Sequence, residues 1–172
     1  TAEITPHHLV LSGEGIFGDT NRKMNPPLRT KEDVKALRKA LKDGVLDIIA
    51  TDHAPHTKEE KDMPYDKATN GIVGLETAFP VCYTSLVKND KFSIMEIIEA
   101  MSLKPAKILG INDIGSIEVG KYADIAIIDI EESYTIDKTK FLSKGQNTPF
   151  DKMSVYGKVE KTLVRGKLIY SI

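Results

Sequence analysis

A carboxylate and an imidazole that can bind a metal ion lie close together after one apolar run. Asp52 and His56 follow the run 46–50, LDIIA, within the sequence TDHAPH. Carboxylate oxygen and imidazole nitrogen suit zinc, and a zinc-bound carboxylate can also accept the proton removed from a bound water. The alternative is that Asp52 caps a turn beside solvated histidines, because the chain has no HxH pair and no HExxH motif. Spacing alone leaves both interpretations open.

The chain has 4 histidines, and two of them, His7 and His8, are adjacent. They lie in a connection, 5–29, whose length usually indicates a function. On an extended segment, neighbouring side chains point to opposite sides, so we do not expect both histidines to reach one metal ion. The same alternation directs His53 away from Asp52, which favours packing or support of a ligand as the role of His53.

A strand, a helix and a second strand are predicted to position these loops. Segments 1–5 and 46–50 are strand-like, and the second lacks alternation, which indicates a strand covered on both faces in a parallel sheet. Between them, Thr30 is a predicted helix N-cap with Asp33 in the capping-box position, and Gly44 ends the helix. Both loops should therefore open at the carboxyl ends of parallel strands, where ligand sites gather.

The remainder divides into a helical and a strand-rich part. Residues 53–73 are predicted to form a polar loop, in which the charged run 59–61 is expected to be solvated. Helices are predicted over three further segments, namely 74–89 with Pro80 near its first turn or at a kink, a segment capped by Ser93 with Glu96, and 105–110. Strands are predicted at 123–129, 158–164 and 167–170, with a tight turn at Arg165 and Gly166. We assign 1–112 to an α/β part and 113–172 to a β-rich part.

Composition excludes several classes of function. With 172 residues and 41% hydrophobic content, the chain can bury a core, and 24 basic against 25 acidic residues give a net charge of -1. No overall field therefore attracts nucleic acid or an anionic membrane, and no apolar run reaches the roughly 18 residues that span a bilayer. Cys82 is the one cysteine, lies in an apolar stretch and is predicted to be a buried, unreactive thiol. We expect a cytoplasmic protein that binds small molecules or other subunits.

Four motifs resemble those of a known family. They are KMNPPLR at 23–29, TDHAPHTKEEK at 51–61, GIVGLETAFP at 71–80 and SKGQNTPF at 143–150. In this order, and with KYADIAIIDI and VRGKLIY, the chain is similar to the C-terminal part of bacterial class I dihydroorotases of the amidohydrolase superfamily. The resemblance implies an α/β fold: part of a (β/α)8 TIM-type barrel in 1–112, with strands seven and eight at 1–5 and 46–50, and part of a small β-sandwich in 113–172.

The resemblance also implies an activity and a site. The family is zinc-dependent, with one or two ions, and interconverts N-carbamoyl-L-aspartate and L-dihydroorotate in pyrimidine biosynthesis. Asp52 matches an aspartate that binds zinc and transfers protons in catalysis. His56 and Asn25 match substrate-binding residues, against the alternatives of a solvated histidine and a structural turn asparagine. Asn70 and Gly71 fall where the family contacts substrate through its backbone, although the usual residue in place of Asn70 is apolar or aromatic.

Other ligands of the family, including an HxHxR motif, are absent from this sequence. A zinc site needs several converging donors, so Asp52 alone would bind zinc weakly. We therefore expect an incomplete C-terminal piece, inactive without the N-terminal portion of the same enzyme, with open strand edges that favour a homodimer. The alternatives are a non-catalytic scaffold module, for example for aspartate transcarbamoylase, and a related hydantoinase or allantoinase.

Overall fold

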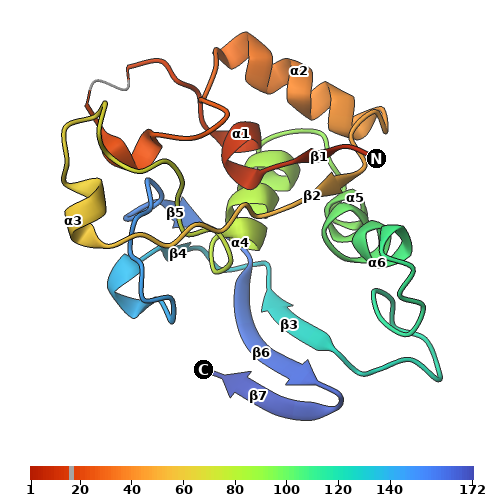
Figure 1. Ribbon diagram of the computed structural model, residues 1–172. Coiled ribbons are helices and arrows are strands. Elements are labelled where there is room, and N and C mark those ends of the chain that lie inside the picture. The colour runs from red at the N-terminus through yellow and green to blue at the C-terminus, as the bar shows by residue number, and fades with distance from the viewer. Residues whose placement is uncertain (16–17) are drawn as a thin grey trace.

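A short parallel sheet and one long helix form the N-terminal part of the computed structural model, which describes residues 1–15 and 18–172 (Figure 1). Strand β1 (Glu3–Ile4) pairs in parallel with β2 (Ile48–Ile49), with Ile4 opposite Ile49. Helix α2 (Lys31–Lys42) connects the two strands. The predicted strand, helix, strand unit is thus confirmed. Residues 16 and 17, which belong to the predicted connection 5–29, lie outside the described residues.

Local signals set both ends of α2. The Thr30 side chain accepts a hydrogen bond from Asp33 N, and Thr30 N donates to the Asp33 carboxylate at 3.0 Å, which completes the predicted capping box. Gly44 follows the helix with φ +75°, a backbone conformation that glycine adopts without steric cost. The predicted start and end of the helix are both confirmed.

The loop predictions missed two short helices. Helix α1 (Pro6–Val10) starts after Thr5, whose side chain accepts from His8 N, and Pro6 at its first position is preset for helical φ. His7 and His8 therefore lie on a helix, and their prediction as part of an extended segment is wrong. Helix α3 (Lys58–Lys61) lies inside the predicted polar loop, and a capping box between Thr57 and Glu60 starts it. Asp19 likewise caps the 3-10 helix η1 (Thr20–Arg22).

The helices between residues 78 and 108 join end to end in two groups. Helix α4 (Ala78–Cys82) continues into the π-helical η2 (Tyr83–Lys88), with Pro80 in its first turn as predicted. Helix α5 (Ile94–Ile98), capped by Ser93, continues through the π-helical η3 (Glu99–Leu103) into α6 (Lys104–Ile108). The short helix predicted over 105–110 is confirmed as α6, which begins one residue earlier and directly follows η3. A π-helical turn directly precedes Pro105, so its missing N–H interrupts no regular α-helical hydrogen bond.

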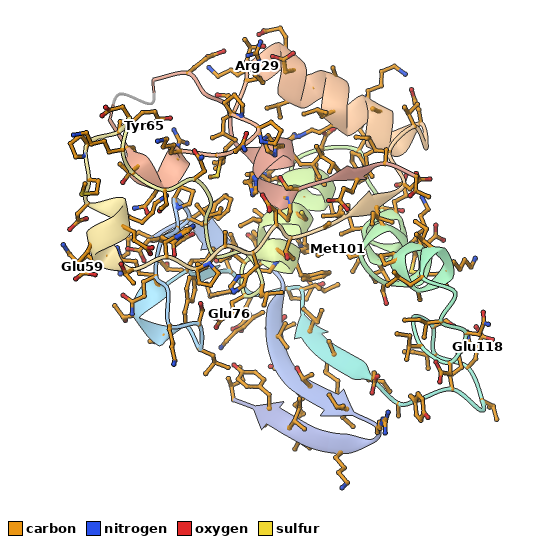
Figure 2. All side chains as sticks on the ribbon, viewed as in Figure 1. Arg29, Glu59, Tyr65, Glu76, Met101 and Glu118 are labelled. Atoms are coloured by element: carbon orange, nitrogen blue, oxygen red, sulfur yellow. The ribbon has the colours of Figure 1, made fainter. Side chains whose placement is uncertain are left out.

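The C-terminal part is built from antiparallel strands. Strand β6 (Lys158–Val164) lies between β3 (Ile125–Asp129) and β7 (Lys167–Ser171), and this sheet extends away from the helices with side chains standing on both faces (Figures 1 and 2). Positive φ values at Arg165 and Gly166 confirm the predicted tight turn. A second pair joins β4 (Tyr134–Thr135) to β5 (Ser154–Val155), near the 3-10 helix η4 (Lys138–Lys140).

Buried apolar side chains of the described residues form two clusters. The first joins the β1–β2 pair to the helices and contains Ile4, Leu9, Leu41, Ile49, Cys82, Leu86, Phe92, Ile97 and Ala100. The second joins residues from both ends of the chain, namely Met24, Leu28, Ile72, Val81, Ile136, Phe150 and Val155. Segment 136–155 therefore packs against the loops that follow β1 and β2. Within the described residues, no helix is long and apolar enough to cross a membrane.

Candidate functional site

Asp52 lies just beyond the carboxyl end of β2 in an unusual backbone conformation. Its φ is +48°, in the left-handed region that non-glycine residues rarely adopt, and its side chain is 51% exposed. A neighbouring element, α1, follows the carboxyl end of β1 and brings His7 Nε2 to 3.9 Å from Asp52 Oδ2. Backbone strain of this kind gathers at functional sites, where the surrounding packing maintains it.

The two histidines of α1 differ in their partners. His7 is buried, and its Nε2 has no hydrogen-bond partner among the described residues. Burial and the neighbouring His8 lower the pKa of His7 to about 4, so its contact with Asp52 is not an ion pair at neutral pH. His8 Nδ1 lies 2.7 Å from Thr5 Oγ1, and its Nε2 lies 3.0 Å from the carbonyl oxygen of Pro26. His8 thus connects α1 to the loop that carries Asn25.

Asn25 is exposed on that loop, and its peptide bond to Pro26 is cis. Lys23, two residues earlier, donates from Nζ to the carbonyl of Ala68 at 2.7 Å. Its own carbonyl accepts a hydrogen bond from Gly71 N at 2.8 Å. The Asn25 loop therefore lies beside the Gly71 loop, although the sequence separates them by more than forty residues.

Gly71 lies against the loop that follows β2. It is buried with φ +100°, and a Cβ there would lie 2.7 Å from Ala54 Cβ and 3.9 Å from His56 Nε2. The His56 side chain is 23% exposed, and its Nδ1 lies 3.4 Å from Glu60 Oε2. Asn70 is exposed next to Gly71. The structure therefore brings His56 and Gly71 together on one side of the candidate site, the His56 edge.

His53 connects the same loop to the residues before α4. Its Nδ1 accepts a hydrogen bond from Gly74 N at 3.0 Å, and its backbone bridges to Ile72 in parallel. This contact orients two loops, which is the packing role, one of the two roles expected for His53.

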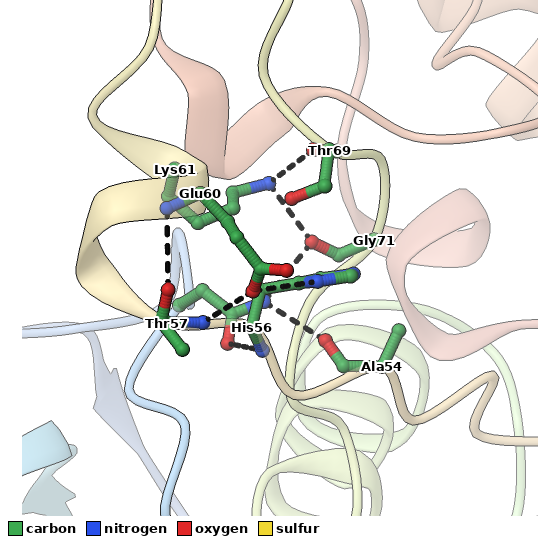
Figure 3. A network of polar contacts seen from close by, with 8 residues as sticks. Ala54, His56, Thr57, Glu60, Lys61, Thr69 and Gly71 are labelled. Atoms are coloured by element: carbon green, nitrogen blue, oxygen red, sulfur yellow. Dashed lines mark hydrogen bonds and ion pairs between the residues drawn. The ribbon is translucent and has the colours of Figure 1, made fainter.

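Two buried polar residues that the sequence did not reveal, Lys61 and Asn147, hold the His56 edge together, and Figure 3 shows the contacts of Lys61. Lys61 is 4% exposed and donates from Nζ to the carbonyls of Thr69 at 2.9 Å and Gly71 at 3.0 Å. The expectation that the charged run 59–61 is solvated is therefore wrong for Lys61, because α3 turns this side chain inward. Asn147 is 5% exposed, and its Oδ1 accepts from His56 N at 3.0 Å. The capping box could have revealed α3, whereas no local signal identifies Asn147.

A cavity of about 370 Å³ adjoins this edge. His56, Lys61 and Asn147 contribute to its lining, together with Lys58, Lys138 and Lys144. Lys58 pairs with Asp62, and Lys138 Nζ lies 3.9 Å from Asp151 Oδ2. Positive charge still exceeds negative charge along the lining, so the cavity suits an anionic ligand better than a cationic one.

Zinc does not fit the described residues by themselves. Asp52 offers a carboxylate, and the unpartnered His7 Nε2 faces it, but the described residues contain no group of three or more metal-binding side chains. Zinc sites in proteins normally supply three or four ligands. Asp52 could contribute one ligand to a metal site, and the described residues alone do not complete one.

These features define an α/β protein whose candidate site lies at the carboxyl ends of parallel strands, the position of active sites in α/β enzymes. Residues 19–169 match the Amidohydrolase family. The chain therefore belongs to the amidohydrolase family.

Relatives similar in sequence to this chain include proteins named dihydroorotase. The chain is 55% identical over 171 residues to a dihydroorotase of Thermoanaerobacter sp. and 53% identical over 171 residues to a dihydroorotase of Bacillus subtilis. Each alignment covers 99% of this chain, but only 39% and 40% of those relatives. The chain thus spans about two fifths of the length of the relatives that it matches.

Solved structures of hydantoinases share the fold. A D-hydantoinase (dihydropyrimidinase) from Thermus sp. superposes with a TM-score of 0.90 at 28% identity. An L-hydantoinase (dihydropyrimidinase) from Arthrobacter aurescens superposes with a TM-score of 0.89 at 33% identity. Both comparisons cover 98% of this chain and 39% of the neighbour.

Proposed function

We propose that this chain is the C-terminal part of a zinc-dependent dihydroorotase, which interconverts N-carbamoyl-L-aspartate and L-dihydroorotate in pyrimidine biosynthesis. Support comes from the 55% and 53% identity to proteins of that name, over about two fifths of their length. In this proposal, β1 and β2 are strands seven and eight of a (β/α)8 barrel. Residues 113–172 are then part of a small β-sandwich.

The observation that carries the proposal is the placement of Asp52. Its carboxylate is half-exposed at a strand end, on a strained backbone and beside a buried imidazole. In the complete enzyme, Asp52 would bind zinc and move a proton during amide hydrolysis, and the remaining ligands would come from the part of the relatives that this chain does not span. Zinc bound there would polarise the amide carbonyl.

The His56 edge is the proposed substrate-binding side of the site. His56 and Asn25 would hold the substrate carboxylate, and Asn70 and Gly71 would contact substrate through their backbone. The excess of lysines around the cavity beside His56 agrees with an anionic substrate. We further propose that the protein is cytoplasmic, works with its N-terminal portion and forms a homodimer. We also propose aspartate transcarbamoylase as a partner that this homodimer would contact.

A hydantoinase is the second candidate, because the solved neighbours with TM-scores of 0.90 and 0.89 have that activity in their names. It would use the same strand-end carboxylate on a different cyclic amide. The two candidates differ in whether the substrate carries a carboxylate for His56 and Asn25 to bind.

Hydrolysis of dihydroorotate and of hydantoin by the full-length protein, with and without Asp52→Ala, tests both candidates. We expect turnover of dihydroorotate that Asp52→Ala lowers by about a thousandfold or more, as for loss of a group that acts in the transition state. Asp43→Ala, at the exposed end of α2, is the control and should keep wild-type turnover. Wild-type turnover in Asp52→Ala would refute the role of Asp52, and turnover of hydantoin alone would favour the second candidate.

A further inference from the structure

We infer that Asn147 and Lys61 are positioning residues, which hold the backbones of His56 and Gly71 together at the substrate-binding edge. The meaning of this edge for substrate rests on the proposed function. The hydrogen bonds themselves do not depend on it, so they can be tested separately.

Asn147 joins three backbone groups of the site through one buried side chain. Its Oδ1 accepts from His56 N at 3.0 Å, and its Nδ2 donates to the carbonyls of Ala54 at 2.9 Å and Gly71 at 3.2 Å. An N–H can only donate and a carbonyl can only accept, so these partners also define which way the amide faces. The contacts bridge 91, 93 and 76 residues of sequence.

The main chain of Asn147 strengthens the same connection. Its carbonyl accepts a hydrogen bond from Val73 N at 3.0 Å, two residues beyond Gly71. Asn147 therefore contacts the Gly71 loop through both its side chain and its backbone. Lateral movement of this loop relative to His56 would break several hydrogen bonds at once.

Lys61 holds the opposite side of the Gly71 carbonyl (Figure 3). That oxygen accepts from Lys61 Nζ at 3.0 Å as well as from Asn147 Nδ2, so both of its lone pairs are used. Lys61 also donates to the Thr69 carbonyl, which fixes the residue two positions earlier. Charge-assisted hydrogen bonds of a buried ammonium are stronger than neutral ones, and they would be lost with the ammonium.

The hydrogen bonds of Asn147 and Lys61 affect the position of the His56 ring because this ring lies close to Gly71. His56 Nε2 is 3.9 Å from the point that a Gly71 Cβ would occupy, and Gly71 has φ +100°. A shift of either backbone changes the position of the imidazole relative to the loop. The side-chain hydrogen bonds of Asn147 and Lys61 all go to backbone groups, so the role inferred for both residues is to position and not to react.

Substitutions of Asn147 and Lys61 in the full-length protein test this inference. Asn147→Ala removes all three side-chain hydrogen bonds, Asn147→Asp keeps the acceptor for His56 N, and Lys61→Met removes the ammonium at similar volume. We expect Asn147→Ala and Lys61→Met to raise KM for dihydroorotate about tenfold with kcat within about twofold, as for loss of one or two hydrogen bonds that orient bound substrate. The matched controls, Asn89→Ala and Lys35→Met, change exposed residues away from the cavity and should keep the wild-type KM.

Amide exchange of His56, followed by NMR after histidine-selective 15N labelling, is the readout that needs no activity. The His56 amide should exchange at least tenfold faster in Asn147→Ala and stay near wild-type protection in Asn147→Asp, because only the first removes its acceptor. Unchanged KM in both Asn147→Ala and Lys61→Met would overturn the inference, as would wild-type exchange in Asn147→Ala. If the wild-type protein fails to hydrolyse dihydroorotate, the proposed function fails, and the exchange rates alone decide the inference.

Discussion

His7 Nε2 lies 3.9 Å from Asp52 Oδ2, beyond the ends of two parallel strands, and has no hydrogen-bond partner in the described part of the chain. The imidazole is buried, whereas the carboxylate is half-exposed. Because burial and His8 lower the pKa of His7 to about 4, the ring is neutral at physiological pH. The site thus keeps an unsatisfied buried nitrogen directly beside its candidate catalytic carboxylate.

An unsatisfied buried polar atom costs about 1–3 kcal/mol, so its removal should not destabilise the protein. We expect His7→Phe, which has a similar shape, to leave the free energy of unfolding unchanged or to raise it by about 1 kcal/mol in urea titrations. His8→Phe is the matched variant and should lower it by about 1–2 kcal/mol, because His8 contacts Thr5 and Pro26 through both ring nitrogens. Equal destabilisation by both changes would contradict this account.

Two glycines with positive φ differ in the space around them. Gly71→Ala should lower the free energy of unfolding by about 3 kcal/mol, since backbone strain adds to a 2.7 Å approach to Ala54 Cβ. Gly44→Ala should cost only about 1 kcal/mol, because nothing lies within 4 Å of the added Cβ. Thermal and urea unfolding of both variants provide the comparison. A milder effect at Gly71 than at Gly44 would show that the Gly71 loop yields easily.

The capping box of α5 makes part of the stability depend on pH. Hydrogen bonds from Ser93 N and Oγ, together with Lys42, hold the pKa of Glu96 below its ordinary value of 4.5. The unfolded chain therefore binds a proton first as pH falls, so the contribution of Glu96 is present above about pH 4.5 and lost below it.

We expect the Tm of the wild-type chain to fall between about pH 5 and 3, and the fall to be smaller in Glu96→Gln. Glu99→Gln, which lies outside the capping box, should retain the wild-type pH dependence. The measurement is thermal unfolding followed by circular dichroism at stepped pH. Identical curves for wild type and Glu96→Gln would rule out the contribution of Glu96.

Cys82 should be unreactive while the protein is folded. Its side chain is 0% exposed within the first core cluster, and burial raises the pKa of its thiol to about 12. A thiol reagent at pH 8 should label it only after denaturant is added. Rapid stoichiometric labelling of the folded protein would show that this core opens.

Local sequence signals predicted much of the fold. The capping box at Thr30, the glycine after α2 and the turn at Arg165 each act over a few residues, and the structure confirms all three. The same kind of signal was available for α1, where Pro6 follows the N-cap Thr5, and for α3, where Thr57 precedes Glu60 by three residues. Both helices are too short, at 5 and 4 residues, to show an apolar periodicity, so only their caps distinguish them from loops.

The residues proposed to act on substrate could be selected from the sequence, because carboxylate and imidazole follow strand ends within familiar motifs. The residues that position them, Lys61 and Asn147, could not be selected in this way. Lys61 is charged in a charged run, and only the inward face of α3 reveals that it is buried. Sequence alone also placed His7 and His8 on an extended segment.

By itself, the sequence determined the β1–α2–β2 unit, the C-terminal hairpin and the carboxylate at a strand end, since propensity, capping and turns depend on near neighbours. Only the tertiary structure decided that His7 faces Asp52 and that Asn147 joins His56 to Gly71. The parallel pairing of β1 with β2 places His7 beside Asp52, and the packing of segment 136–155 in the second hydrophobic cluster places Asn147 beside His56 and Gly71. Burial and contact across such separations follow from packing of the whole chain, which no short stretch of residues encodes.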